Sequence, residues 1–266
     1  MSEHTRIGSG RTAEVYAIND DKVLKLFHPS VSEATVQKEY DVSKRLVAMD
    51  MPVPTVFRRI EKDNRKGIVY EYIKGTAMTE VIAKKPWKAR KAARLLANLH
   101  LNMHAHSVSS FPRFKDVLRV GIDRSGLDAR LKEKLQNTLD GIKDATILCH
   151  GDFHPDNILW KKQSIHIIDW LDATCGHPLL DVARTKMLLE HSALPDDLGR
   201  FEKRIVTIIR RSFLRTYLKT YFKRSAYDKD ALVIYEPIVM AARMSETIPD
   251  QEKDVIRDAL IQKVNI

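Results

Sequence analysis

Two acidic side chains and one amide occur close together in the sequence. Asp152 and Asn157 lie in the segment HGDFHPDNILW, residues 150–160, and Asp169 ends a short apolar segment that follows. Pro155 favours a loop within the first segment. Carboxylate and amide oxygens are ligands that Mg²⁺ prefers, and a carboxylate can orient a hydroxyl for attack on phosphorus. These residues therefore predict magnesium-dependent transfer of a nucleotide γ-phosphate.

The composition is that of an ordinary globular protein. The chain has 266 residues, of which 44% are hydrophobic and 30% charged, enough for one large domain or two lobes. No apolar run approaches the ~18–20 residues needed to span a bilayer, and residues 1–8 lack the apolar region of a secretory signal. We therefore expect a cytoplasmic protein. Cys149 and Cys175 could form a disulfide, but a reducing compartment favours two free thiols.

The chain carries a formal net charge of +10, and its basic residues cluster in residues 84–94 and 200–224. Two interpretations are open: solvated helix faces, or attraction to anionic partners such as nucleic acid, a membrane surface or a phosphorylated substrate. Aromatic residues are not regularly interleaved with these charges, so a nucleic-acid module is not predicted.

The first part of the chain reads mostly as strands. Residues 13–18 and 22–27 form one expected hairpin, and residues 56–60 and 66–73 form a second. Apolar spacing predicts a helix over residues 32–49 between them.

The second part is mainly helical. Helices are expected over residues 86–106, 127–143, 178–191, 197–223 and 229–244. A hairpin with strands at residues 158–160 and 165–168 interrupts this pattern. The change from strands to helices predicts an α+β, two-lobed chain, with an N-terminal lobe over residues 1–73 and a C-terminal lobe over residues 74–266.

This order of elements resembles the protein-kinase-like fold, and specifically the aminoglycoside/choline phosphotransferase family of small-molecule kinases. The resemblance runs from about Ile7 to Arg184, and residues 150–157, 168–170 and 178–183 carry its most specific motifs. It implies a bilobal fold and an ATP- or GTP-dependent kinase that uses Mg²⁺ and acts on an alcohol group.

The resemblance also assigns roles to the motif residues. Asp152 takes the position of the catalytic base, which accepts or orients the proton of the acceptor hydroxyl. Asn157 and Asp169 take the positions of the metal ligands. His150 and Asp181 are expected to brace the catalytic loop.

The residues that the resemblance assigns to nucleotide binding come from the first lobe: Gly8, Ser9, Gly10, Lys25, Glu39, Glu71 and Ile73. The glycines belong to a loop over the phosphates, in which Ala13 replaces a third glycine. Lys25 is expected to touch the α- and β-phosphates and to pair with Glu39. Glu71 and Ile73 are named for their backbone groups alone.

The histidines do not form a metal-ligand pattern among themselves. His100 is expected to be a packed, hydrogen-bonded helix residue.

The acceptor is expected to be small. Residues 170–177 alone separate Asp169 from Pro178, which leaves little chain for a peptide platform. Substrate-side candidates are Asp172, Tyr235, Glu236 and Arg243. An atypical protein kinase and a catalytically silent nucleotide-binding regulator are the alternatives.

The expected partners are a nucleotide and a small hydroxylated molecule, and the sequence leaves the oligomeric state and the acceptor open. An aminoglycoside is polycationic and needs an acidic pocket, so the basic C-terminal part argues weakly against it. Arg210, Arg211 and Arg215 would favour an anionic acceptor if they face inward.

Overall fold

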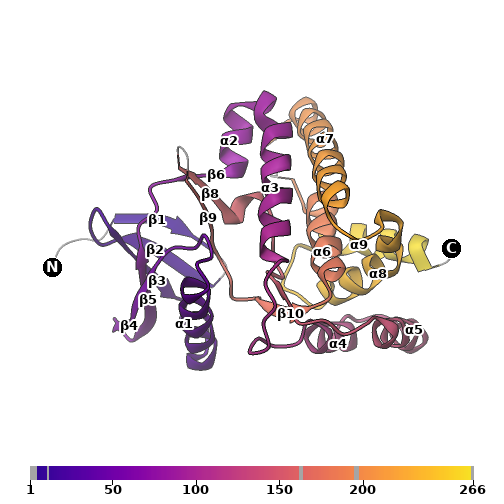
Figure 1. Ribbon diagram of the computed structural model, residues 1–266, viewed down its shortest axis with the longest axis horizontal. Helices are drawn as coiled ribbons and strands as arrows, with labels where there is room; N and C mark the ends of the chain where they lie inside the picture. The colour runs from indigo at the N-terminus through magenta and orange to yellow at the C-terminus, as the bar shows by residue number, and fades with distance from the viewer. Residues whose placement is uncertain (1–4, 11, 162–163, 195–197, 265–266) are drawn as a thin grey trace. The chain divides into compact units, whose positions relative to one another are not determined.

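The computed structural model describes residues 5–10, 12–161, 164–194 and 198–264 (Figure 1). The chain divides into two compact units. The first contains Met1–Glu80 and Pro155–Asp172, and the second contains Val81–His154 and Ala173–Ile266. The units are thus interleaved in sequence, whereas the change of pattern along the chain predicted one boundary, after residue 73.

The first unit contains a five-stranded antiparallel sheet with the strand order β1-β2-β3-β5-β4. Its strands are β1 (Thr5–Ser9), β2 (Ala13–Ala17), β3 (Lys22–Phe27), β4 (Val56–Lys62) and β5 (Arg65–Glu71). Helix α1 (Glu33–Ala48) connects β3 to β4. The Ser32 hydroxyl accepts a hydrogen bond from the Thr35 N–H at 3.2 Å and so caps the first turn of this helix.

Alternation along the strands gives the sheet two apolar faces. Phe27 and Ile68 pack with Val36 of α1 on one face, while Leu24 and Val69 belong to a separate apolar cluster. Successive side chains of a strand point to opposite faces, so neighbouring residues of β5 contribute to different clusters. Strand β3 therefore has buried apolar side chains on both faces of the sheet.

The β4–β5 hairpin is tighter than the sequence predicted. The expected loop covered residues 61–65, but Glu61 and Arg65 are paired strand residues. Only Asp63 and Asn64 form the turn, with φ values of 52° and 57°. Asp and Asn tolerate this left-handed conformation, which matches the twist of a two-residue hairpin.

A second sheet joins distant parts of the first unit. Strand β6 (Thr76–Ala77) pairs with β8 (Ile158–Lys161), and β8 pairs with β9 (Ser164–Ile167). The pairing of Thr76 with Trp160 is one reason that residues 155–172 belong to the first unit.

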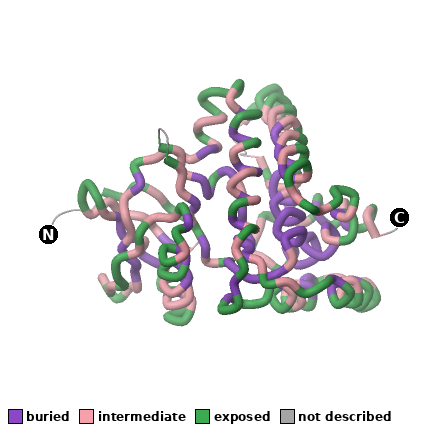
Figure 2. Tube along the Cα trace, viewed as in Figure 1, coloured by how far each residue is buried: buried purple, intermediate pink, exposed green. Residues whose placement is uncertain are grey.

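The second unit is predominantly helical. Its helices are α3 (Ala89–Met103), α4 (Phe114–Asp123), α5 (Ala129–Gly141), α6 (Pro178–His191), α7 (Arg200–Arg224), α8 (Leu232–Arg243) and α9 (Asp250–Val264), and helix α2 (Met78–Lys84) leads into it. Figure 2 shows α6 and α8 buried along most of their lengths. Within the described ranges, no helix combines the length and apolar character needed to cross a membrane.

A short antiparallel pair, β7 (Ile147–Cys149) and β10 (Thr174–Gly176), completes this unit. Cys149 and Cys175 lie in these strands as buried free thiols. Burial raises the pKa of the Cys149 thiol well above its usual value, so this thiol is held in its protonated form.

Three helices were not predicted: α2, α4 and α9. Helix α4 contains Gly121, a poor helix former. Packing explains this glycine, because a Cβ added there would lie 2.8 Å from the Ala242 Cβ of α8. Tertiary contact therefore outweighs local propensity.

Candidate active site

Lys25 connects two acidic residues within the first unit. Its Nζ lies 2.8 Å from Glu39 Oε1 and 3.2 Å from Asp169 Oδ1. Burial lowers the pKa of Lys25, but the charges and hydrogen bonds of Glu39 and Asp169 outweigh burial, so the pKa is raised. Lys25 is therefore a cation, as phosphate binding requires. The expected pairing with Glu39 is present, and the nucleotide-binding role stays a prediction.

Tyr70 holds Glu39 from the other side. Its hydroxyl donates to Glu39 Oε1 at 3.0 Å and lies 3.1 Å from Ser43 Oγ. Glu39 Oε2 is buried and makes no hydrogen bond to a described residue. Burial, together with the Glu39 charge, raises the pKa of Tyr70 well above its usual value, so the hydroxyl remains a donor.

Asn157 and Asp169 lie at the same end of the β8–β9 hairpin. Ile158 pairs with Ile167, and the Ile168 N–H donates to the Asn157 carbonyl at 2.9 Å. Asp169 follows with a φ of 63°. A left-handed conformation is uncommon for a residue other than glycine, and such strain is concentrated at functional sites.

These two residues fit a magnesium ion by their chemistry. The Asn157 amide and the Asp169 carboxylate offer hard oxygen donors. The Asp169 side chain is 48% exposed, so an ion can reach it. Its carboxylate is already oriented by Lys25.

Two of the three residues expected over the phosphates belong to a strand. Gly8 and Ser9 belong to β1 and pair with Val15 and Glu14 of β2. The Gly10 N–H donates to the Ala13 carbonyl at 2.8 Å and begins the turn between these strands.

Glu71 and Ile73 lie at and just beyond the end of β5. The Glu71 N–H donates to the Thr55 carbonyl at 2.8 Å, and the Glu71 carboxylate accepts from the Thr55 N–H at 3.1 Å. Gly75 N–H donates to the Ile73 carbonyl at 2.7 Å. Their expected role toward a nucleotide base stays a prediction.

In the second unit, Asp152 lies in a polar environment within a largely buried loop. Its Oδ2 lies 3.3 Å from His154 Nε2, and its side chain is 15% exposed. Burial opposes ionisation, but the His154 hydrogen bond and the charges of His154, Arg184 and His150 outweigh it and hold the pKa of Asp152 below its usual value. Asp152 is therefore a carboxylate at neutral pH, which suits a group that orients a hydroxyl proton.

Asp181 anchors the backbone immediately before Asp152. Its carboxylate accepts hydrogen bonds from the His150 N–H at 2.7 Å and the Gly151 N–H at 2.9 Å. His150 Nδ1 in turn accepts from the Asp152 N–H at 3.2 Å. Gly151 adopts a φ of 80°, which glycine enters without steric cost. The structure thus contains the expected backbone contacts of Asp181 and His150.

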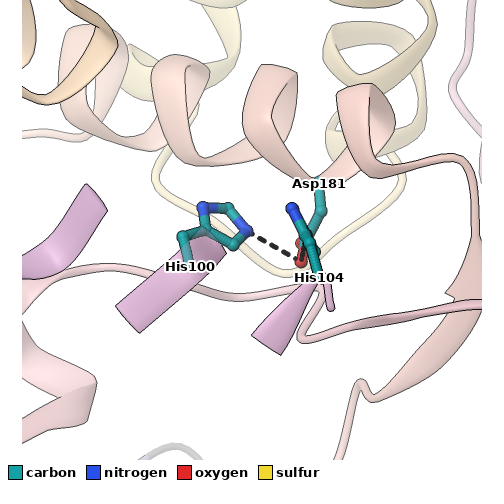
Figure 3. Close-up of side chains that lie close together, drawn as sticks. All are labelled: His100, His104 and Asp181. Carbon is teal, nitrogen blue, oxygen red and sulfur yellow. Dashed lines mark hydrogen bonds and ion pairs between the residues drawn. The ribbon is translucent and has the colours of Figure 1, made fainter. Parts of the chain in front are cut away.

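His100 of α3 and His104, which directly follows this helix, hold Asp181 in place (Figure 3). His100 Nε2 and His104 Nε2 lie 3.1 and 3.4 Å from Asp181 Oδ2. Their Nδ1 atoms lie 2.6 and 2.8 Å from the hydroxyls of Tyr217 and Tyr221 of α7. The sequence predicted that His100 is a packed, hydrogen-bonded helix residue. It did not predict that two histidines and two tyrosines together support Asp181.

His100, His104 and Asp181 could also be considered as metal ligands, because one ligand atom of each lies within 4.8 Å of the others. However, all of these atoms are already engaged in hydrogen bonds, and His100 and Asp181 are buried. Burial and the neighbouring His104 lower the pKa of His100 to about 3, so His100 is neutral. The cluster is a closed hydrogen-bond network beneath the catalytic loop.

Helix α6 supplies two further contacts that the sequence reasoning missed. Arg184 Nε donates a short hydrogen bond to the Gly151 carbonyl, and Thr185 Oγ1 donates to the Phe153 carbonyl at 2.9 Å. Arg184 and Thr185 lie three and four positions after Asp181, on the same helix face. This spacing was the signal that could have identified them.

The substrate-side candidates have different environments. Asp172 is exposed at the end of the first unit. Tyr235 stacks on His177 with ring centroids 5.1 Å apart. Glu236 and Arg243 are buried in ion pairs, the first with Lys186 and Lys263 and the second with Glu246 and Glu252. The buried pairs indicate a structural role for Glu236 and Arg243, and any substrate role of the four candidates stays a prediction.

Solved structures of small-molecule kinases share this fold. A choline kinase from Cryptosporidium parvum Iowa II aligns with a TM-score of 0.61 and 15% identity, covering 99% of this chain and 89% of that chain. The aminoglycoside-3'-phosphotransferase of type VIII aligns with a TM-score of 0.62 and 17% identity, covering 90% and 93%. At these identities the likeness shows the kinase-like fold, which confirms the predicted α+β bilobal class.

Two curated relatives are longer proteins. The acyl-CoA dehydrogenase family member 11 of Gallus gallus is 26% identical over 172 residues, or 56% of this chain and 22% of that protein. The acyl-CoA dehydrogenase family member 10 of Mus musculus is 24% identical over 176 residues, or 57% and 16%. The matched part of this chain thus spans 22% of the first relative's length and 16% of the second's.

The model of the phosphotransferase enzyme family matches residues 3–229, which include the catalytic loop, the β8–β9 hairpin and α6. On this match, together with the shared fold, the chain belongs to the phosphotransferase enzyme family.

Proposed function

We propose that this protein transfers the γ-phosphate of ATP to a hydroxyl group of a small molecule. The observation that carries the proposal is the state of Asp152, a carboxylate held by His154 on a loop that Asp181 and Arg184 anchor. A fixed carboxylate of this kind can receive or orient the proton of an alcohol.

The reaction proceeds by in-line displacement at the γ-phosphorus. The acceptor oxygen forms the new P–O bond, and the bond to the leaving ADP breaks. The hydroxyl proton passes toward the Asp152 carboxylate and is released to solvent, so the products are a phosphate monoester, ADP and a proton. Asp152 orients the hydroxyl that would otherwise sample many directions.

We assign phosphate binding to the first unit. Lys25 would contact the nucleotide phosphates, held in place by Glu39, and Asn157 and Asp169 would hold Mg²⁺. When bound, the ion would neutralise charge on the phosphate oxygens. Gly8, Ser9 and Gly10 would approach the phosphates through their backbone.

Two structural neighbours support this donor. An amicoumacin kinase, which aligns with a TM-score of 0.64, was solved with AMP-PNP, Ca²⁺ and Ami, and an aminoglycoside phosphotransferase that aligns at 0.61 was solved with streptomycin and ATP. Both proteins therefore bind a nucleotide together with a small molecule.

The test is acceptor-dependent consumption of nucleotide. Purified protein with Mg²⁺ and either ATP or GTP is incubated with a panel of alcohols, including neutral polyols, amino alcohols, hydroxycarboxylates, phosphorylated alcohols and aminoglycosides. The proposal expects turnover with at least one small alcohol, loss of turnover in Asp152→Asn, and formation of a phosphate monoester. Absence of acceptor-dependent turnover across the panel contradicts it.

A further inference from the structure

We infer that a basic cavity in the second unit binds an anionic group of the acceptor, so that the substrate class is a hydroxylated carboxylate or phosphate ester. This inference rests on the proposed function, because it specifies the acceptor of that reaction. The cavity has a volume of about 1030 Å³ and is bordered by α6, α7 and α9. It is large enough for a small metabolite.

The wall of this cavity is strongly positive. Cations from three helices line it: Lys186, Lys203, Arg210, Arg211, Arg215 and Lys263. The carboxylates among the described lining residues are Glu190 and Glu252. A concave surface lined mainly by one sign of charge concentrates the field and attracts ions of opposite sign.

Two of these cations are already paired with carboxylates, Lys186 with Glu190 and Glu236, and Lys263 with Glu236. Glu252 pairs with Arg243 at 2.9 Å, and Glu190 pairs with Lys186 at 2.6 Å. Lys203, Arg211 and Arg215, in contrast, make no ion pair with a carboxylate in the described parts of the chain. The positive charge of α7 therefore exceeds what its described surroundings neutralise.

Three arginines of α7, Arg210, Arg211 and Arg215, border the cavity. Arg210 is half-buried there, whereas Arg211 and Arg215 are exposed at its edge. Arg210 Nη1 also donates to the Ser192 carbonyl at 2.6 Å, which fixes its side chain at the wall. Guanidinium groups suit carboxylate and phosphate because they can donate two parallel hydrogen bonds.

One polar atom of the wall lacks a partner among the described residues. His191 Nε2 is buried without a hydrogen bond, although Glu190 Oε2 lies 3.8 Å away. Burial lowers the pKa of His191, so its ring is neutral and can donate or accept one hydrogen bond. A bound polar ligand would satisfy this atom.

Helix α6 connects the cavity to the catalytic loop. Thr185 contacts the Phe153 carbonyl on one face of the helix, and the next residue, Lys186, lines the cavity with Leu189. Successive residues of an α-helix are turned by about 100° and rise ~1.5 Å. The loop and the cavity therefore adjoin different faces of the same helix, and the acceptor must be long enough to reach Asp152 from the cavity.

The binding experiment uses inorganic phosphate as the probe. Isothermal titration is performed with the nucleotide site saturated by Mg²⁺ and a non-hydrolysable ATP analogue. The variant R211Q/R215Q removes two exposed cations that line the cavity, and the matched control R204Q/K219Q removes two exposed cations of α7 that do not line it. We expect about a tenfold or greater loss of affinity in R211Q/R215Q, and little change in the control. Equal weakening in both variants, or no binding by the unmodified protein, overturns the inference.

The kinetic experiment connects the cavity to the reaction. Among alcohols of similar size, anionic acceptors are expected to have the higher kcat/KM, and R211Q/R215Q is expected to raise their KM about ten- to hundredfold with little change in kcat. Turnover of neutral or cationic alcohols alone overturns the inference and leaves the proposed function standing. If phosphate binds as expected but no alcohol is phosphorylated, the proposed function fails, and with it the acceptor role of the cavity.

Discussion

His100 Nε2 lies 3.1 Å from Asp181 Oδ2 in the interior of the second unit, and both side chains are fully buried. The same Asp181 carboxylate holds the backbone N–H groups of His150 and Gly151. The relationship therefore links helix α3 to the loop that carries Asp152. Since the Tyr217 hydroxyl lies 2.6 Å from His100 Nδ1, α7 contributes to the same support.

This network should make the stability of the folded protein depend on pH. The pKa of His100 is lowered to about 3, so between that value and ~6.5 the unfolded chain binds a proton that the folded chain does not. Burial opposes ionisation of Asp181, but the hydrogen bonds of His100 and His104 outweigh it and lower the pKa of Asp181 well below its usual value. Protonation of Asp181 therefore also destabilises the folded chain, at a lower pH. The free energy of unfolding should therefore fall by on the order of a few kcal/mol as pH falls from 7 to 4. Urea denaturation at several pH values measures it.

The matched variants for this prediction are His100→Gln and His106→Gln. His100→Gln should reduce stability at pH 7 and flatten its pH dependence, because the titrating group is gone. His106 contacts the Asn102 carbonyl near the surface and should behave like the unmodified protein. An unchanged pH slope in His100→Gln would contradict the assignment.

Asp152→Asn should lower kcat by ~10²–10⁴ and leave binding of the Mg-nucleotide nearly unchanged, because the lost carboxylate acts on the acceptor. Steady-state kinetics and nucleotide titration measure the two effects. Asp156→Asn is the matched control, since Asp156 contacts Thr79 and carries no assigned role. A normal kcat in Asp152→Asn would refute its role.

Asp169→Ala should weaken magnesium-dependent nucleotide binding more than Asp152→Asn does. The substitution removes a full negative charge from the expected ion, and neither Asn157 nor water replaces a carboxylate well. Calorimetric titration with and without Mg²⁺ gives the comparison, and the magnesium-free titration is the internal control. Equal affinities of the two variants would contradict the metal-ligand assignment.

Lys25→Met should weaken nucleotide binding and destabilise the first unit. Glu39 would remain buried, with Tyr70 as a donor but without its cationic partner, which costs about 3 kcal/mol in comparable buried pairs. The double variant Lys25→Met/Glu39→Gln should recover most of the stability but none of the nucleotide affinity. Chemical denaturation and nucleotide titration separate the two effects, and recovery of affinity would contradict the role of Lys25.

Protein substrates should not be phosphorylated. Helix α6 begins at Pro178, and β10 occupies residues 174–176, so the chain after Asp169 has little length for a peptide platform. Radiolabelled phosphate transfer to a set of peptides and proteins, beside the alcohol panel, is the measurement. Robust Asp152-dependent labelling of proteins, with no response to any alcohol, would reverse this expectation while leaving the fold unchanged.

The fold class and the motif segments could be predicted from the sequence because their signals are local. Residues of high strand propensity predicted β2 and β3, and helical spacing predicted α1 and α6 within one or two residues of their bounds. Residues 150–157 carried the family resemblance, and the family match confirms it. The pairing of Lys25 with Glu39 was expected from that resemblance and is present.

Tertiary structure decided what local signals could not. Helix α4 forms despite Gly121 because close packing on α8 needs that glycine. The contact of Lys25 with Asp169, residues far apart in the chain, exists only once the β8–β9 hairpin is placed in the first unit. A helical pattern does not tell whether an exposed face borders a cavity, and the packing of α7 beside α6 and α9 places the exposed Arg211 at the edge of one.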